Sequence, residues 1–141
     1  MTQEDKRLLL IDLSGRLPYN VKVRVTYWDN DESITDDFIL NEIDTRYPSN
    51  LYWLGGNQLQ EHGISPGTTS FASNSDDDDE IVKPYLRPMS SMSFEEKAYC
   101  FAVNEQPVVY IDWLNEHHFD YRGLIEKGLA LEAPEGMYEF N

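Results

Sequence analysis

The sequence predicts an α+β fold, a small antiparallel sheet packed by N-terminal and C-terminal helices. Two observations indicate this class. Residues 21–28 alternate between apolar and polar side chains, as in a strand with one buried face. Apolar residues near both ends of the chain recur instead at intervals of three and four, which is typical of amphipathic helices. We expect a single domain, residues 1–141, with a mobile acidic loop at 73–80.

The chain is expected to begin with a helix at 3–14. Leu9 and Leu13 lie four residues apart and therefore share a helix face. Gly15 is suited to cap the C-terminus of that helix. The alternating valines then predict a strand at 19–28 with one face in the core.

The segment "DNDES" is rich in turn formers, so "ITDDFILNEI" is expected to return as a partner strand at 34–43. The phase of this second strand is open, because three apolar residues, 38–40, are consecutive. A short aromatic strand is expected at 51–54. Turns are expected around it, at Pro48, Gly55-Gly56, Gly63 and Pro66-Gly67.

The C-terminal part is expected to combine an extended segment with helices. "EIVKPYLRPM" is held extended by its two prolines. Ser93 followed by Glu96 has the spacing of a capping box, and an apolar stripe follows, so a helix is expected at 94–104. That stripe consists of Phe94, Ala98 and Phe101.

Pro107 is suited to the first turn of another helix, at 108–117. Asp120 is expected to cap a short helix that Gly128 terminates. The tail "MYEF" alternates apolar and polar residues, so it is expected either to add a last strand or to dock on a neighbour.

The chain is strongly acidic, with a formal net charge of −15 at pH 7. Residues 1–71 carry 11 acids and 6 bases, residues 81–141 carry 10 acids and 5 bases, and "DDDDE" supplies the other acids. Such a molecule repels nucleic-acid phosphates and anionic membranes, so neither is expected as a direct partner. The expected partner is a protein, and a basic surface on it would complement this charge.

The N-terminus lacks the pattern of a signal peptide, and no segment has the length needed to span a bilayer. The only cysteine, Cys100, fits a reducing compartment, and we expect a cytoplasmic protein. Within the predicted apolar helix its thiol is expected to be buried and unreactive.

The stretch "WLNEHHFDYRG" brings polar residues together, chiefly His117, His118 and Asp120. Adjacent histidines on a helix point about 100° apart, so they are poorly placed to chelate one ion. Asp112 and Glu116 have a useful helical spacing, but they are acids on an expected solvated face. We expect packing here, with no metal and no cofactor. A metal-dependent enzyme that uses this 112–120 cluster is the alternative.

No motif for nucleophilic catalysis or for phosphate or dinucleotide binding occurs, and we expect no enzyme activity. The abundance of carboxylates makes any single acid pair uninformative. "VKPYLRPMSSMS" is more suggestive, because prolines stiffen it beside apolar anchors and little entropy is lost when such a segment docks. Its candidate contact residues are Tyr85, Leu86, Arg87, Met89 and Met92. Packing inward is the equally open alternative.

Three stretches, "RLPYNVKVRV", "IVKPYLRPMSSMSFEEK" and "FDYRGLIEKGLALEAPEGMY", together resemble small uncharacterised acidic proteins of gut-bacterial genomes and their prophages. The resemblance covers about half of the chain and implies no activity and no site residue. It implies an accessory gene of mobile-element or phage origin. We therefore expect a non-catalytic protein-interaction module, with a DNA-mimicking inhibitor of a nucleic-acid-binding protein as a second alternative.

Overall fold

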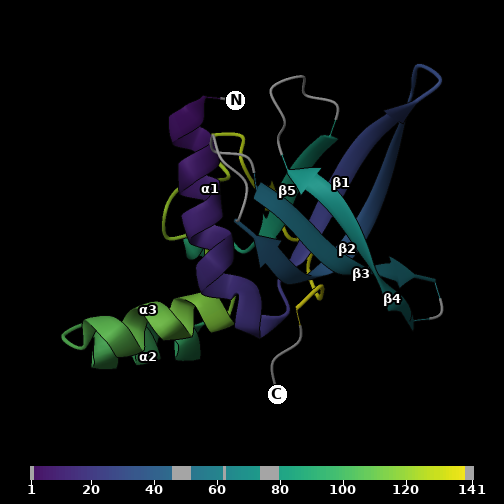
Figure 1. Cartoon of the computed structure of the whole chain (residues 1–141). Helices are drawn as coiled ribbons and strands as arrows, with labels where there is room; N and C mark the ends of the chain where they lie inside the picture. Colours follow the sequence, from purple (N-terminus) through teal and green to yellow (C-terminus); the bar gives the residue numbers. More distant parts are fainter. Residues whose placement is uncertain (1, 46–51, 62, 74–79, 139–141) are drawn as a thin grey trace. The chain divides into compact units, whose positions relative to one another are not determined.

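The computed structural model describes residues 2–45, 52–61, 63–73 and 80–138 (Figure 1). The chain divides into two compact units, Met1–Pro84 and Tyr85–Asn141. That these units fold as one domain stays a prediction. The acidic loop expected at 73–80 falls mainly outside the described residues, since Ser73 ends one strand and Glu80 begins the next.

The first unit begins with helix α1 (Gln3–Arg16), which lies alongside the sheet of this unit (Figure 1). Thr2 and Asp5 form a capping box at its start. The expected cap at Gly15 is wrong, because the helix continues past it into a 3-10 turn, η1 (Leu17–Tyr19). The turn ends at Asn20, which has a left-handed backbone.

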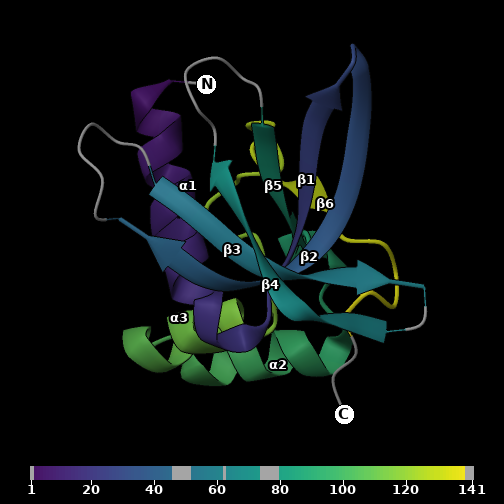
Figure 2. The same ribbon diagram turned by 45° about the vertical axis from the view of Figure 1, so that its right-hand side comes forward.

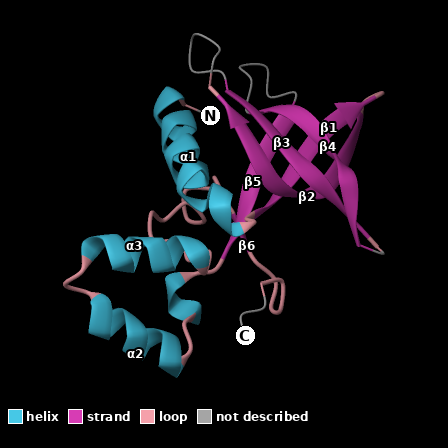
Figure 3. Cartoon of the chain, turned by 60° about the horizontal axis from the view of Figure 1, so that its bottom comes forward, coloured by secondary structure: helices cyan, strands magenta, loops and turns pink. Residues whose placement is uncertain are grey.

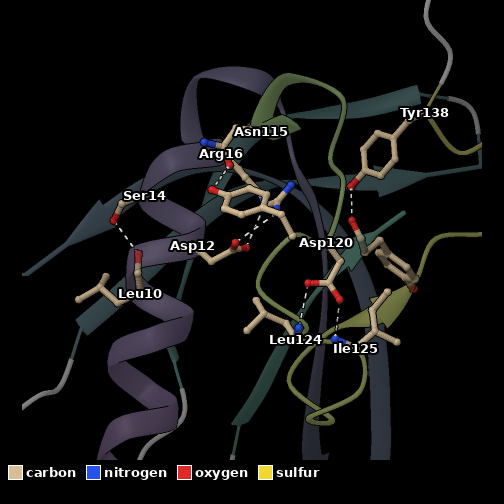
Figure 4. Close-up of polar contacts among 11 residues, drawn as sticks. Leu10, Asp12, Ser14, Arg16, Asn115, Asp120, Leu124, Ile125 and Tyr138 are labelled. Carbon is tan, nitrogen blue, oxygen red and sulfur yellow. Dashed lines mark hydrogen bonds and ion pairs between the residues drawn. The ribbon is translucent and has the colours of Figure 1, made fainter. Parts of the chain in front are cut away.

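One face of α1 carries an ion pair as well as leucines. Leu9 and Leu13 are fully buried, as the helical spacing indicates. Asp12 and Arg16 are also fully buried, and Arg16 Nε donates to Asp12 Oδ2 over 2.8 Å (Figure 4). Because the two residues are four apart on one helix, the charge of each is matched within the same element.

Four strands of the first unit and the strand that continues from it into the second unit form an antiparallel sheet (Figure 2). In chain order they are β1 (Lys22–Asp29), β2 (Glu32–Asp44), β3 (Tyr52–Gln60), β4 (Gly63–Ser73) and β5 (Glu80–Leu86). Strands β1 to β4 form a meander, and β5 returns to the free side of β1. The resulting order is β4-β3-β2-β1-β5.

The predicted hairpin of β1 and β2 is confirmed. Val23 and Val25 are buried while Arg24 is exposed, which is the alternation that predicted the strand. Asn30 and Asp31 make the turn, both with positive φ, as a two-residue hairpin turn requires. In β2, Phe38 and Leu40 are buried and the residue between them is only half-buried, which resolves the phase that the sequence left open.

Strand β3 is longer than expected, because Gly55 and Gly56 lie inside the strand and do not form a turn. A Cβ on Gly56 would lie 2.6 Å from the carbonyl oxygen of Ile39 on β2. The glycine therefore permits a close approach of two backbones, a role that glycine also has within strands. The expected turn at Pro66-Gly67 is likewise wrong, because both residues lie within β4. The turn expected at Pro48 lies outside the described residues.

The regular secondary structure of the second unit is mainly helical (Figure 3). The last two residues of β5 pair in parallel with β6 (Leu131–Glu132). Between these strands lie η2 (Met89–Ser91), α2 (Phe94–Val103) and α3 (Pro107–Glu116). Ser93 and Glu96 form the predicted capping box, and Pro107 begins α3 as predicted.

The helix expected between Asp120 and Gly128 is wrong, because this segment forms turns. Asp120 still caps backbone there, since its carboxylate accepts from the amides of Leu124 and Ile125 over 2.8 and 2.9 Å (Figure 4). The capping chemistry is thus the predicted one, but the backbone that it stabilises is a loop. In the tail, Met137 and Tyr138 form a bend, and the next residues lie outside the described part.

The α+β class is confirmed, with a mostly antiparallel sheet and helices near both ends of the chain. Over the described residues, no helix combines the length and apolar character that crossing a bilayer requires.

Candidate functional site

The predicted contact segment is partly core. Tyr85 and Leu86 are 3% and 0% exposed at the end of β5, and the Tyr138 hydroxyl donates to the carbonyl oxygen of Tyr85 over 2.9 Å (Figure 4). These two side chains are therefore unavailable to a partner in the folded unit. Met89 is exposed, and Met92 is half-buried.

Arg87 connects the end of β5 with the start of α2. Its Nη2 donates to Glu96 Oε1 over 2.8 Å, and its guanidinium lies 4.1 Å above the ring of Phe119. Glu96 also accepts from the backbone N–H of Ser93 over 2.9 Å. Burial by itself would raise the pKa of Glu96, but the hydrogen bonds from Arg87 and Ser93 outweigh it and hold that pKa below its ordinary value.

A groove of about 800 Å³ opens beside this ion pair, entirely within the second unit. Glu96 is the carboxylate that Arg87 neutralises, whereas Glu132 and Glu135 are exposed acids, so the net charge of the lining is negative. The lining residues are Arg87, Pro88, Ser91, Ser93, Glu96, His117, Glu132, Ala133, Pro134, Glu135, Gly136 and Tyr138.

The polar cluster of the 117–120 segment is used for local packing. His117 stacks on Trp113 at 4.4 Å, and its Nδ1 donates to the carbonyl oxygen of Trp113 over 3.0 Å, because a carbonyl can only accept. His118 is buried with a left-handed backbone and stacks on Tyr138 at 3.9 Å. Asp120 caps backbone amides. Each side chain thus engages a different partner.

Potential metal ligands are likewise dispersed. In the part of the chain that the structure describes, no group of three or more His, Cys, Asp or Glu side chains is placed to hold a metal ion. Asp112 and Glu116, the other acids of the cluster, are exposed. The thiol of Cys100 is half-buried, and burial, together with the nearby charge of Glu96, raises its pKa. A raised pKa keeps a thiol protonated and weakly nucleophilic.

The first unit has a smaller hollow of about 230 Å³ on its sheet. Its floor includes Phe38 and Phe71, whose ring centroids are 5.1 Å apart. At its side the hydroxyl of Tyr27 donates to Asp36 over 3.3 Å, and burial together with the charge of Asp36 raises the pKa of Tyr27. Tyr27 is therefore a neutral donor at neutral pH.

The most unusual surface of the second unit is an apolar stripe on α2, made of Phe94, Ala98 and Phe101 and here named the α2 stripe. A stripe with this spacing ordinarily faces the core. Here Phe94 is 84% exposed and Phe101 is 80% exposed, and Ala98 is exposed between them.

The opposite face of α2 explains this orientation. It carries Val103, which is buried, and Cys100 and Glu96, which are half-buried. The anchor of that face is the Arg87–Glu96 ion pair together with the contact between Cys100 Sγ and Met92 Sδ at 3.7 Å. Helical periodicity locates the stripe but does not reveal that a second face of the helix is the buried one. On α3, Val108 is 74% exposed.

Comparison with protein-family models, with curated proteins and with solved structures gave no significant match. The function is therefore inferred from the residues of this chain.

Proposed function

We propose that this chain is a non-catalytic protein-interaction module and that the α2 stripe is its contact surface. The single observation that supports the proposal is the exposure of two phenylalanine rings, Phe94 and Phe101, on one helix face. Burying one phenylalanine side chain stabilises a complex by about 1.5–3 kcal/mol, so two rings two turns apart on one helix face provide a strong anchor. Aromatic anchors of this kind dominate the energetics of protein interfaces.

The proposed contact surface lies away from part of the segment predicted from the sequence. Tyr85 and Leu86 are buried at the end of β5. Arg87 orients α2 through Glu96, and Met89 is the exposed apolar residue that remains in that segment. The interaction hypothesis is therefore proposed here with different residues, on the helix that follows.

The two other hypotheses have less support. A metal-dependent enzyme would need side chains that converge, but His117, His118 and Asp120 each engage a separate partner. A DNA mimic depends on the net charge of −15, which also accounts for repulsion between molecules and for solubility. Neither has an observation comparable to the α2 stripe.

The partner is best sought in a bacterial lysate. A mobile-element or phage origin, which we propose from the resemblance of three stretches, favours a host or phage protein as the partner. The single cysteine fits a reducing cytoplasm, so reducing conditions suit the capture.

The experiment compares captured proteins for three versions of the chain. They are the wild type, the double variant Phe94→Ser/Phe101→Ser, and Ile64→Ser as a matched control, since Ile64 is 56% exposed in the other unit. We expect a protein that the wild type and Ile64→Ser both retain and the double variant loses. Identical proteins captured by all three chains would show that the α2 stripe is not the contact surface.

A further inference from the structure

We infer that the occupant of the α2 stripe is a basic amphipathic helix of the partner protein. The inference rests on the proposed function and adds the chemistry of the partner. It combines the spacing of the stripe with the charges exposed on α2 and on α3.

The shape of the stripe suits a helix. Phe94, Ala98 and Phe101 follow the spacing i, i+4, i+7, so their Cα atoms span roughly 10 Å along α2, or two helical turns. Because alanine is much smaller than phenylalanine, one bulky side chain of a second helix could pack over Ala98 between the two rings. This is the ridge-and-groove packing by which helices associate, and short helical anchors are commonly read at the same spacing.

The exposed charges of the two helices favour a basic partner helix. The exposed charged side chains of α2, of α3 and of their connection are four acids and a single base. Opposite charge on the partner would steer its approach and set its specificity. The acids are Glu95, Glu105, Asp112 and Glu116, and the base is Lys97.

The same charges disfavour a second copy of this chain as the occupant. Each copy carries a net charge of −15, so association through the stripe would bring two acidic surfaces together. The carboxylates of the neighbouring groove, Glu132 and Glu135, add to this repulsion if the copies approach on that side. The acidic surface therefore attracts a basic helix and repels a second copy of the chain.

The probe is a synthetic helical peptide with leucine at i, i+4 and i+7 and lysine on both flanks, labelled for fluorescence anisotropy. One control peptide replaces the lysines with glutamate, and another replaces the leucines with serine. The protein variants are Phe94→Ser/Phe101→Ser, Asp112→Asn/Glu116→Gln and the control Ile64→Ser. Each full-length variant is first shown to unfold at the wild-type temperature.

We expect the lysine peptide to bind the wild type and Ile64→Ser equally. The phenylalanine variant should bind it at least about tenfold more weakly, because the apolar anchor is lost. The variant with two neutralised acids should bind it about threefold more weakly, and binding should weaken as salt rises, because exposed charges are screened beyond about 10 Å at 0.1 M salt.

Several results would overturn the inference while leaving the proposed function in place. The first is that the glutamate peptide binds as tightly as the lysine peptide. The second is that the affinity for the lysine peptide is unchanged when Asp112 and Glu116 are neutralised. The third is that no peptide binds, although capture of the lysate partner still requires the two phenylalanines. Self-association in sedimentation experiments that the phenylalanine variant abolishes would identify a second copy as the occupant. If the phenylalanine variant behaves like the wild type in both the lysate and the peptide experiment, the proposed function fails as well.

Discussion

Arg87 Nη2 lies 2.8 Å from Glu96 Oε1, and this ion pair fixes the start of α2 to the strand end that precedes it. Glu96 is also the third helical residue of the capping box that Ser93 begins. One carboxylate thus satisfies a backbone amide and orients the helix. The orientation matters because it turns Glu96 and Cys100 inward and the α2 stripe outward.

Replacing Glu96 with glutamine should lower the free energy of unfolding by about 1 kcal/mol at pH 7, since a charge-assisted hydrogen bond is lost. The pKa of Glu96 is depressed in the folded state, so the unfolded chain takes up this proton first as the pH falls. The stability from Glu96 is therefore fully present above its ordinary pKa of 4.5 and is lost as the pH falls through the lower folded value.

Urea titrations of the wild type and Glu96→Gln between pH 7 and pH 3 check this prediction. The difference between them should shrink below about pH 4.5. Glu95→Gln is the control, because Glu95 is exposed in the same turn of the helix. A difference that stays constant over the whole range would contradict the role given to the ion pair.

Ser93→Ala should destabilise the chain by about 1 kcal/mol, the typical effect of removing an N-cap hydroxyl. The hydroxyl of Ser93 accepts from the backbone N–H of Glu96 over 3.2 Å. Thermal unfolding measures the loss, and Ser93→Asp, which keeps a capping oxygen, should retain most of the stability. If the alanine and aspartate variants unfold at the same temperature, the cap does not stabilise α2.

Gly56→Ala should destabilise the first unit by about 1–3 kcal/mol, since the added methyl group would lie 2.6 Å from the carbonyl oxygen of Ile39. The matched control is Gly67→Ala on the neighbouring strand, where the added methyl group would have nothing within 4 Å. Chemical denaturation should show a clear loss for the first variant and little change for the second. Equal effects would contradict the close approach of β2 and β3.

Asp12→Ala should destabilise the chain by about 3–5 kcal/mol, because it leaves the buried guanidinium of Arg16 without this carboxylate. Replacing both residues with apolar side chains, as in Asp12→Leu/Arg16→Met, should recover much of that loss, since no buried charge then remains at these two positions. The denaturation midpoints of the two variants are compared, and the double variant should have the higher one. A double variant no more stable than Asp12→Ala would refute the explanation.

The α+β class and much of the local chemistry could be predicted from the sequence, because they depend on short-range patterns. The alternation in β1, the capping box of α2 and the capping role of Asp120 are all local. The sequence pattern around Gly56 instead indicates a turn. That prediction is wrong because the role of this glycine depends on Ile39, a strand partner that is distant in sequence. The exposure of Phe94 could not be predicted for the same reason, since it depends on the ion pair between Arg87 and Glu96 on the opposite face of α2.

The central claim is that the α2 stripe contacts a protein partner, and site-specific photo-cross-linking tests it most directly. A photoreactive phenylalanine analogue is placed at position 101 or, as a control, at position 64, and the protein is irradiated in bacterial cells. We predict a discrete cross-linked protein from position 101 and none from position 64. Equal cross-linking from both positions, or none from position 101, would contradict the claim.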